Sequence, residues 1–343
     1  MKGKHMKRYG IAAIATAAAL LLSACAGPAE TTPGDSGNGE RVTVRVGYIP
    51  GAHDIAQLFL AERAGYFEDQ GIVIETTSFQ TGISLAQALT GGSLDVGVMG
   101  AVVANFPAKG QGKLVVLNNQ QVDIHQIWAS PESGISSVED LKGKTIATTS
   151  GTASDLVLQV ALDKAGLTRD DVEVVNLDMP AVANAFVTGA VDAASLWSPF
   201  DQQVAEHMPD ATLVATAAEL DSPISGGWVA SNAFYEEHPE LVLGMVRAWQ
   251  AANTDLLADP EASFDIFCPR IEQQMNRELC EDLYGKTDPL SNEDWVTVYT
   301  DGTALGWLEN MQSVFEQIGA LQGAELQPKD YFDTQIFIDA LAE

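Results

Sequence analysis

Positive charge and aromatic side chains are both scarce in this chain of 343 residues. Lys and Arg together number 18 against 47 for Asp and Glu, and Phe, Trp and Tyr make up 7% of the sequence. A net charge of -29 argues against a nucleic-acid-binding protein, because such proteins present a basic surface. We therefore expect small molecules or other proteins as partners. Most of the acidic side chains are expected on solvated surface, where they carry no information about a ligand.

Motifs that carry common enzyme chemistry are missing as well. The sequence contains no GxSxG elbow, no Walker loop, no dinucleotide-binding glycine fingerprint and no HExxH helix. The histidines beyond residue 25 are too scattered to form a set of metal ligands. They are His53, His125, His207 and His238. The sequence thus predicts a protein that is not an enzyme and that holds no metal or cofactor.

Long apolar runs are absent after residue 25, and the run before it belongs to an export signal. Residues 2–8 are basic, residues 11–22 are apolar and small residues follow. The segment ends in Leu22-Ser23-Ala24-Cys25, which resembles the lipobox of bacterial lipoproteins. We predict that residues 1–24 are removed and that Cys25 carries lipid, which would anchor the protein at the outer face of the membrane. An ordinary signal with an incidental Cys25 is the alternative.

Residues 25–40 are predicted to form a disordered tether, because they contain Gly, Pro, Ser, Thr and acids but almost nothing to bury. Folding is expected from Arg41 onward. The remaining cysteines, Cys268 and Cys280, have eleven residues between them. In an exported chain they are expected to form a disulfide that closes a local loop, and two buried free thiols are the alternative.

Hydrophobic residues alternate between strand-like and helix-like spacing in two successive cycles. The expected strands are 42–48, 72–74, 94–98, 114–117, 145–149, 172–175 and 193–197, and the expected helices are 55–64, 85–89, 153–165 and 181–187. Each cycle also contains a similar Gly-to-Asp phrase before a strand, ending at Asp95 and at Asp192. The pattern predicts an α/β fold with mainly parallel sheets and flanking helices. From about residue 241 the chain becomes helical and acidic, and we expect this tail to clamp the first lobe.

Several phrases of the sequence, taken in order, resemble one family of solute-binding proteins. They are Val44-Arg-Val-Gly-Tyr48, Ala64-Gly-Tyr-Phe67, Gly91-Gly-Ser-Leu-Asp95-Val-Gly97, Glu139-Asp-Leu-Lys-Gly-Lys144 and Asp192-Ala-Ala-Ser-Leu-Trp197-Ser-Pro199. Over roughly residues 42–260 the chain resembles the ABC-importer components that bind nitrate, taurine, alkanesulfonates and thiamine-pyrimidine precursors. Glu173-Val-Val-Asn-Leu177 and His238-Pro-Glu-Leu-Val242 look most like the taurine branch.

The resemblance implies a two-lobed clamshell of the type II periplasmic-binding-protein kind, which closes on a solute. Lobe 1 is expected at 41–127 and 224–343 and lobe 2 at 128–223, with crossing segments near 126–129 and 222–229. The closed form would deliver its solute to an ABC permease and its ATPase, and the protein is expected to act as a monomer. Taurine or an alkanesulfonate is the favoured solute, with nitrate or a thiamine-pyrimidine precursor as alternatives. A surface ligand sensor and an enzyme on the same fold are the other classes, although the Cys-rich motif of the enzymatic branch is absent.

The loop from Thr149 to Ser154 joins a strand to a helix and is expected to face the cleft. Ser150, Thr152 and Ser154 would offer hydroxyl groups there, together with the free backbone N–H groups of a helix N-terminus, which attract an anionic head group. A plain helix cap is the alternative. In the first lobe, the loops at the carboxyl ends of the strands contribute candidate ligand residues, namely His53, Asp54, Gln80 and Gly100. His53 and Gln80 could donate to a sulfonate or carboxylate, and Asp54 could accept from an amine.

Aromatic candidates complete the predicted site. Trp197 ends a strand and is expected to contact the carbon chain of the ligand. Trp228 and His125 lie close to the expected crossings and are further candidates. For either tryptophan, a position in the core is the alternative. The taurine branch has an acidic residue just before the aromatic residue of the second crossing, where this sequence has Gly226 and Gly227. Asp54 or Asp201 could replace that acid, or the ligand has no amine.

Overall fold

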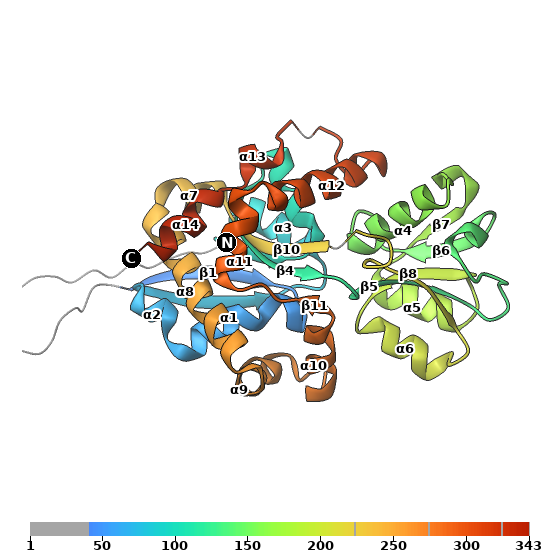
Figure 1. The fold of residues 1–343 in the computed structure, drawn as a ribbon, viewed down its shortest axis with the longest axis horizontal. Coiled ribbons are helices and arrows are strands. Elements are labelled where there is room, and N and C mark those ends of the chain that lie inside the picture. The colour runs from blue at the N-terminus through green and yellow to red at the C-terminus, as the bar shows by residue number, and fades with distance from the viewer. Residues whose placement is uncertain (1–40, 223, 274, 324, 343) are drawn as a thin grey trace, which may run out of the picture. The chain divides into compact units, whose positions relative to one another are not determined.

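The computed structural model describes residues 41–222, 224–273, 275–323 and 325–342. They form two α/β lobes, each built on one sheet with flanking helices (Figure 1), which confirms the predicted two-lobed α/β fold. The predicted signal, Cys25 and the tether lie outside the described residues. None of the helices in the described ranges has the length and apolarity needed to cross a membrane.

The first sheet has the strand order β11-β4-β10-β3-β1-β2. Its strands are β1 (Val42–Tyr48), β2 (Ile72–Ser78), β3 (Val96–Met99), β4 (Lys113–Gln121), β10 (Ile224–Ala230) and β11 (Thr287–Asp288). β1 pairs in parallel with β2 and β3, but β10 runs antiparallel to both of its neighbours, β3 and β4. β4 leaves the lobe at its carboxyl end and β10 returns at that same edge, so β10 must run in the opposite direction.

The second sheet repeats this arrangement with the order β7-β6-β8-β5-β9. Its strands are β5 (His125–Ala129), β6 (Thr145–Thr148), β7 (Glu173–Asn176), β8 (Ala193–Trp197) and β9 (Thr212–Thr216). Here β5, which arrives from the first lobe, is antiparallel to β8 and β9, while β6 is parallel to β7 and β8. Most strands of each sheet run in one direction, as predicted, and both sheets are mixed because each also contains a strand that enters from the other lobe and runs against its neighbours.

Helices follow the strands as the sequence predicted. The helices of the two cycles are α1 (Ala52–Ala64), α2 (Tyr66–Asp69), α3 (Gly82–Thr90), α4 (Ala153–Lys164), α5 (Met179–Val187) and α6 (Phe200–His207). Short 3-10 helices lie at Ala101–Ala104, Pro107–Lys109, Val138–Leu141, Arg169–Asp171 and Cys268–Ile271. α1 ends at Gly65, whose φ of 83° is in the left-handed region where glycine carries no Cβ penalty.

The repeated Gly-to-Asp phrase has the same structural role in both lobes. The carboxylate of Asp95 accepts the backbone N–H of Arg45 at 2.8 Å, and that of Asp192 accepts the backbone N–H of Thr145 at 2.9 Å. Arg45 lies in β1 and Thr145 begins β6, so each acid satisfies a backbone donor of the neighbouring parallel strand. The likeness of the two phrases thus reflects the same strand-pairing requirement in each sheet.

The two crossings lie at slightly different places from those predicted. The first comprises residues 122–124, between β4 and β5, because residues 126–129 already pair with β8 and β9. The return crossing runs between β9 and β10, and most of the predicted segment 222–229 is strand β10. The expected boundary between residues 127 and 128 therefore falls inside β5. The carbonyl of Lys286 accepts the N–H groups of Val122 and Asp123 at 3.1 and 3.2 Å, which ties the first crossing to the tail.

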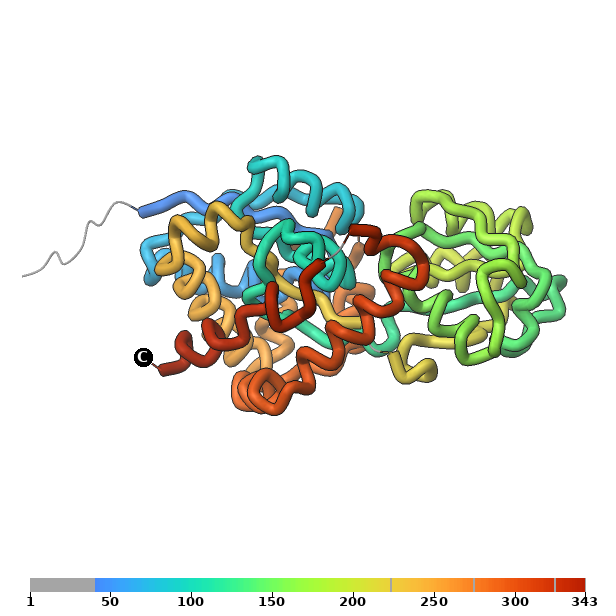
Figure 2. Tube along the Cα trace, turned by 90° about the horizontal axis from the view of Figure 1, so that it is seen from above, coloured from blue at the N-terminus to red at the C-terminus, as the bar shows by residue number. Residues whose placement is uncertain are grey.

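The tail after β10 is helical, as predicted, and packs around the first lobe (orange to red in Figure 2). Its helices are α7 (Asn232–Glu237), α8 (Pro239–Ala258), α9 (Pro260–Phe267), α10 (Arg277–Gly285), α11 (Asn292–Thr300), α12 (Thr303–Gln317), α13 (Pro328–Tyr331) and α14 (Thr334–Leu341). α8 packs on α1 and α14, and α12 also contacts α4 of the second lobe. Cys268 and Cys280 form a disulfide, as expected from the sequence, with their Cα atoms 5.8 Å apart.

Candidate ligand-binding site

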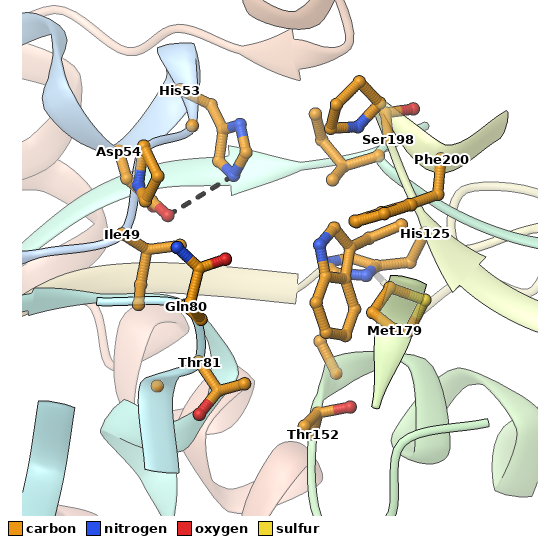
Figure 3. A pocket seen from close by; sticks show the side chains of 18 of the residues that line it. Ile49, His53, Asp54, Gln80, Thr81, His125, Thr152, Met179, Ser198 and Phe200 are labelled. Carbon is orange, nitrogen blue, oxygen red and sulfur yellow. Dashed lines mark ion pairs between the residues drawn. The ribbon is translucent and has the colours of Figure 1, made fainter. Parts of the chain in front are cut away.

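A cavity of about 1020 Å³ lies between the two lobes. Its walls follow the carboxyl ends of β1, β2 and β3 in the first lobe and of β6, β7 and β8 in the second. Open α/β sheets offer their ligand sites at this edge, because the loops and helix N-termini converge there. Figure 3 shows side chains of the first lobe, such as Gln80 and Thr81, facing Met179 and Phe200 of the second across the cavity.

Most of the site residues predicted from the sequence line this cavity. They are His53, Asp54, Gln80, Gly100, His125, Thr152 and Trp197. His53, Asp54 and Gln80 lie on the side of the first lobe and His125 and Thr152 on the opposite side (Figure 3). The sequence therefore located both walls, although their segments lie far apart in the chain.

Three predicted residues lie elsewhere. Ser150 is exposed, and its N–H donates to Asn176 Oδ1 at 2.9 Å rather than lining the cavity. Ser154 is fully buried, because the first turn of α4 rotates it away from the cavity and places Thr152 and Ala153 there instead. Trp228 is also fully buried, and its ring stacks on Phe67 with the centroids 6.4 Å apart. None of these three side chains lines the cavity, and Trp228 belongs to the core.

Among the described residues, the helices α1, α3, α4, α5 and α6 begin at the cavity. The first N–H groups of a helix have no partner within that helix, and together they carry a partial positive charge. Among the described residues that line the cavity, none is Lys or Arg, and the acidic residues are Asp54 and Asp178. An anionic group of a ligand would therefore be bound by backbone N–H groups, hydroxyls and amides.

Asp54 lies in the first turn of α1 and is only 3% exposed. Its Oδ1 accepts weak hydrogen bonds from Asn119 Nδ2 at 3.3 Å and from Gln121 Nε2 at 3.4 Å, and its Oδ2 lies 3.4 Å from His53 Nε2 (dashed line in Figure 3). Burial raises the pKa of Asp54, while the charge of His53 and the hydrogen bond from Asn119 act in the opposite direction. The carboxylate is thus desolvated and only loosely paired.

His125 continues this network on the other side of Gln121. Its Nε2 lies 2.8 Å from Gln121 Oε1, and because the Gln121 amide nitrogen donates to Asn119 Oδ1 at 3.0 Å, His125 Nε2 must be the donor. Burial, with a smaller contribution from His53, lowers the pKa of His125 to about 3, so the ring is neutral. Its Nδ1 is then an acceptor, and this buried atom has no partner among the described residues.

The core of the first lobe holds α1 in place for this network. Trp249 of α8 packs against Trp295 and Phe337, and its Nε1 donates to Asn118 Oδ1 at 2.6 Å. The Asn118 amide in turn donates to the backbone carbonyls of His53 and Asp54, at 3.2 and 3.0 Å. The start of α1 is therefore fixed by a buried hydrogen-bond chain that reaches into the aromatic core.

Apolar side chains cover much of the remaining wall. Trp197 is half-buried, and its ring meets that of Phe200 edge to face with the centroids 6.2 Å apart. Met275 and Leu279 reach the cavity from the tail, on either side of the start of α10, within the loop closed by the disulfide. Sequence reasoning missed these two residues, because the apolar spacing of α10 predicts a helix but not the neighbour on which it packs.

Metal binding has no support in the geometry of the described residues. In the ranges that the structure describes, no three His, Cys, Asp or Glu side chains gather in a way that could hold a metal ion.

Asp201, the second acid proposed as an amine partner, is already paired with Lys286 Nζ at 2.8 Å.

Two α/β lobes with a cavity between them are the architecture of binding proteins of the periplasmic type. The family described as NMT1/THI5 like matches residues 52–263, and the chain belongs to this family. A binding protein of Brucella abortus is 33% identical over 300 residues, which cover 87% of this chain and 92% of that protein. The taurine-binding periplasmic protein of Escherichia coli is 27% identical over 232 residues, covering 65% and 69% of the two chains.

Solved structures of the same fold include both a binding protein and an enzyme. The periplasmic aliphatic sulphonate binding protein SsuA from Escherichia coli superposes with a TM-score of 0.68 at 18% identity, covering 86% of this chain and 99% of that one. The desulfurization enzyme DSZB superposes with a TM-score of 0.61 at 17% identity, covering 88% and 99%. At such identities the likeness shows the fold alone, and the function must be argued from the site.

Proposed function

We propose that this protein is the extracytoplasmic solute-binding component of an ABC importer and that its two lobes close on a small solute. The observation that carries this proposal is the cavity lined by the carboxyl ends of both sheets, between lobes that the chain joins by crossing segments. A solute that contacts both walls has more contacts in the closed form, so binding would shift the population toward closure. The closed form would then be recognised by a membrane permease and its ATPase, without any bond being broken.

The favoured solutes are small anionic or zwitterionic compounds of the taurine and alkanesulfonate class. Two observations support this class: relatives are named for taurine and for aliphatic sulfonates, and several helix N-termini begin at the cavity. Thr152 and Gln80 would contact the anionic head, and Trp197 with Phe200 would cover the carbon chain. Nitrate and a thiamine-pyrimidine precursor are the alternatives, and nitrate has no carbon chain for that aromatic wall.

A ligand panel tests this proposal. We expect taurine or an alkanesulfonate to bind the purified folded domain with micromolar affinity, about -8 kcal/mol. Isothermal titration calorimetry and thermal shift would be run with sulfonates, nitrate, carboxylates and pyrimidines. Binding of a carboxylate or pyrimidine alone would move the protein to another solute class, and no binding across the whole panel would contradict the proposal.

Membrane anchoring belongs to the same proposal, although Cys25 lies outside the described residues. The Leu-Ser-Ala-Cys ending of the export signal is the feature that supports it. A full-length Cys25→Ser variant is expected to move from the membrane fraction to the soluble extract, whereas Cys268→Ser should leave the fractionation unchanged. Retention of Cys25→Ser in the membrane fraction would contradict the lipid anchor.

A further inference from the structure

We infer that the solute carries a protonated nitrogen, and that the buried carboxylate of Asp54, in the network of Asn119, Gln121 and His125, binds it. This inference rests on the proposed function, because it assigns a chemical class to the solute of the same cavity. It concerns a positively charged group of the solute, whereas the helix N-termini would bind a negative one.

The charge of the cavity wall is the first reason. Asp54 and Asp178 are the carboxylates among the described lining residues, and no lining Lys or Arg balances them. A buried carboxylate is normally paired with a cation, because desolvation of an isolated charge is costly. Asp54 has two weak amide donors and His53, which is a cation only when protonated. A cation supplied by the solute would complete this site.

The arrangement of acceptors is the second reason. Because His125 Nε2 donates to Gln121, His125 Nδ1 is an acceptor, and this buried atom has no partner among the described residues. The His125 side chain lines the cavity and is 5% exposed. Asp54 adds carboxylate oxygens close to the same network through Gln121. A group that satisfies acceptors of this kind must donate several hydrogen bonds, as an ammonium does with its three N–H donors.

Gly226 is the third reason, because it makes room for this cluster. A Cβ at residue 226 would lie 2.9 Å from Asp54 Oδ1, 3.0 Å from Gln121 Nε2 and 3.2 Å from Asn119 Oδ1. The backbone of β10 therefore passes close to the three polar groups without a side chain that would push them apart. The same glycine leaves Asp54 at the cavity wall, where a solute can reach it.

A matched pair of acids provides the test. Asp155 occupies the first turn of α4 as Asp54 does that of α1, and it is similarly buried, but it pairs with Arg169 at 2.7 Å and does not line the cavity. If Asp54 is a buried carboxylate whose cation comes from the ligand, the unliganded protein carries it without that partner. Asp54→Asn should then raise the melting temperature of the unliganded protein by about 2 °C. Asp155→Asn should lower it, because Arg169 would lose its charged partner.

Binding supplies the second readout. Taurine would be compared with ethanesulfonate, and homotaurine with propanesulfonate, with propylamine as a cation without the anionic head. We expect the aminated member of each pair to bind the wild-type protein about tenfold more tightly. Asp54→Asn should remove this preference and leave the affinity for the sulfonates without an amine within about twofold. Gly226→Ala should also weaken the preference, and Asp155→Asn should keep it.

The possible outcomes separate this inference from the proposed function. Equal binding of aminated and plain sulfonates would overturn the inference and leave a sulfonate-binding protein. Binding of propylamine alone, abolished by Asp54→Asn, would support the inference and contradict the sulfonate class. If no compound binds, the unliganded melting temperatures decide: a lower value for Asp54→Asn would assign the carboxylate a structural role and overturn the inference, and a higher value would support it.

Discussion

The two lobes repeat one strand order and one helix placement, yet the acidic residue at the same position of each lobe has different surroundings. α1 follows β1 and α4 follows β6, and each helix has an Ala-x-Asp start that ends in Asp54 or in Asp155. Asp155 forms a short ion pair with Arg169, whereas Asp54 meets two amides, His53 and a cavity. A neutralised acid stabilises its own lobe. An acid in the same place without a strong cation partner is available to a ligand.

The amino-terminal turn of a helix explains why an acid occurs at both places. A carboxylate there interacts favourably with the first N–H groups, and Asp155 Oδ2 accepts the N–H of Gly151 at 2.9 Å. This local requirement is common to the two lobes, so it cannot account for the difference between them. The difference comes from what surrounds each acid. Asp155 meets the guanidinium of Arg169, which follows α4 in the chain, whereas Asp54 meets side-chain amides of β4 beside Gly226.

Removing Arg169 should have the largest effect, because it would make the second lobe resemble the first. Arg169→Met leaves Asp155 buried without its cation, and we expect a loss of about 2 kcal/mol in the free energy of unfolding, measured with a chemical denaturant. Lys142→Met is the control, since Lys142 is 68% exposed in its pair with Asp171 and such pairs contribute less than about 1 kcal/mol. Similar losses for the two variants would contradict this difference between the acids.

Much of the fold and part of the site could be predicted from the sequence. Strands 42–48 and 193–197 have the predicted bounds, because alternation and strand propensity agree there. The rule that ligands bind at the carboxyl ends of parallel strands predicts Asp54 and Trp197 on opposite walls, and both line the cavity. These predictions succeeded because they depend on local patterns and on one general property of open sheets.

The features that were missed depend on packing between distant segments. Trp228 has the same aromatic character as Trp197, and only the position of Phe67 shows that it faces the core. Met275 and Leu279 belong to the tail, whose path around the first lobe is set by tertiary contacts. The loose pairing of Asp54 was also not predictable, because it requires the relative positions of α1, β4 and β10.

The aromatic wall gives the next prediction, since Trp197 and Phe200 are the second lobe's aromatic contribution to the cavity. Trp197→Ala should weaken solute binding about tenfold, or about 1.4 kcal/mol, because the indole covers the carbon chain of the ligand. Trp128→Ala is the matched control: Trp128 is also half-buried in the second sheet, but it does not line the cavity. Trp128→Ala should lower the free energy of unfolding and leave the affinity for the solute unchanged in calorimetry. If Trp197→Ala binds as tightly as the wild type, its ring is structural and the aromatic wall does not contact the solute.

The pH dependence of stability gives the smallest expected effect and isolates Asp54 from every other acid. Burial raises the pKa of Asp54 above its ordinary value of 3.8, so the folded protein takes up this proton at a higher pH than the unfolded chain does. Above the raised pKa the charged carboxylate lowers stability, and as the pH falls through that pKa the Asp54 carboxyl becomes neutral in the folded protein and this penalty disappears. The melting-temperature advantage of unliganded Asp54→Asn over the wild type should therefore shrink between about pH 7 and about pH 4. Groups common to both proteins largely cancel in this difference. An advantage that stays constant or grows toward acid pH would mean that the folded protein stabilises the Asp54 charge without a ligand.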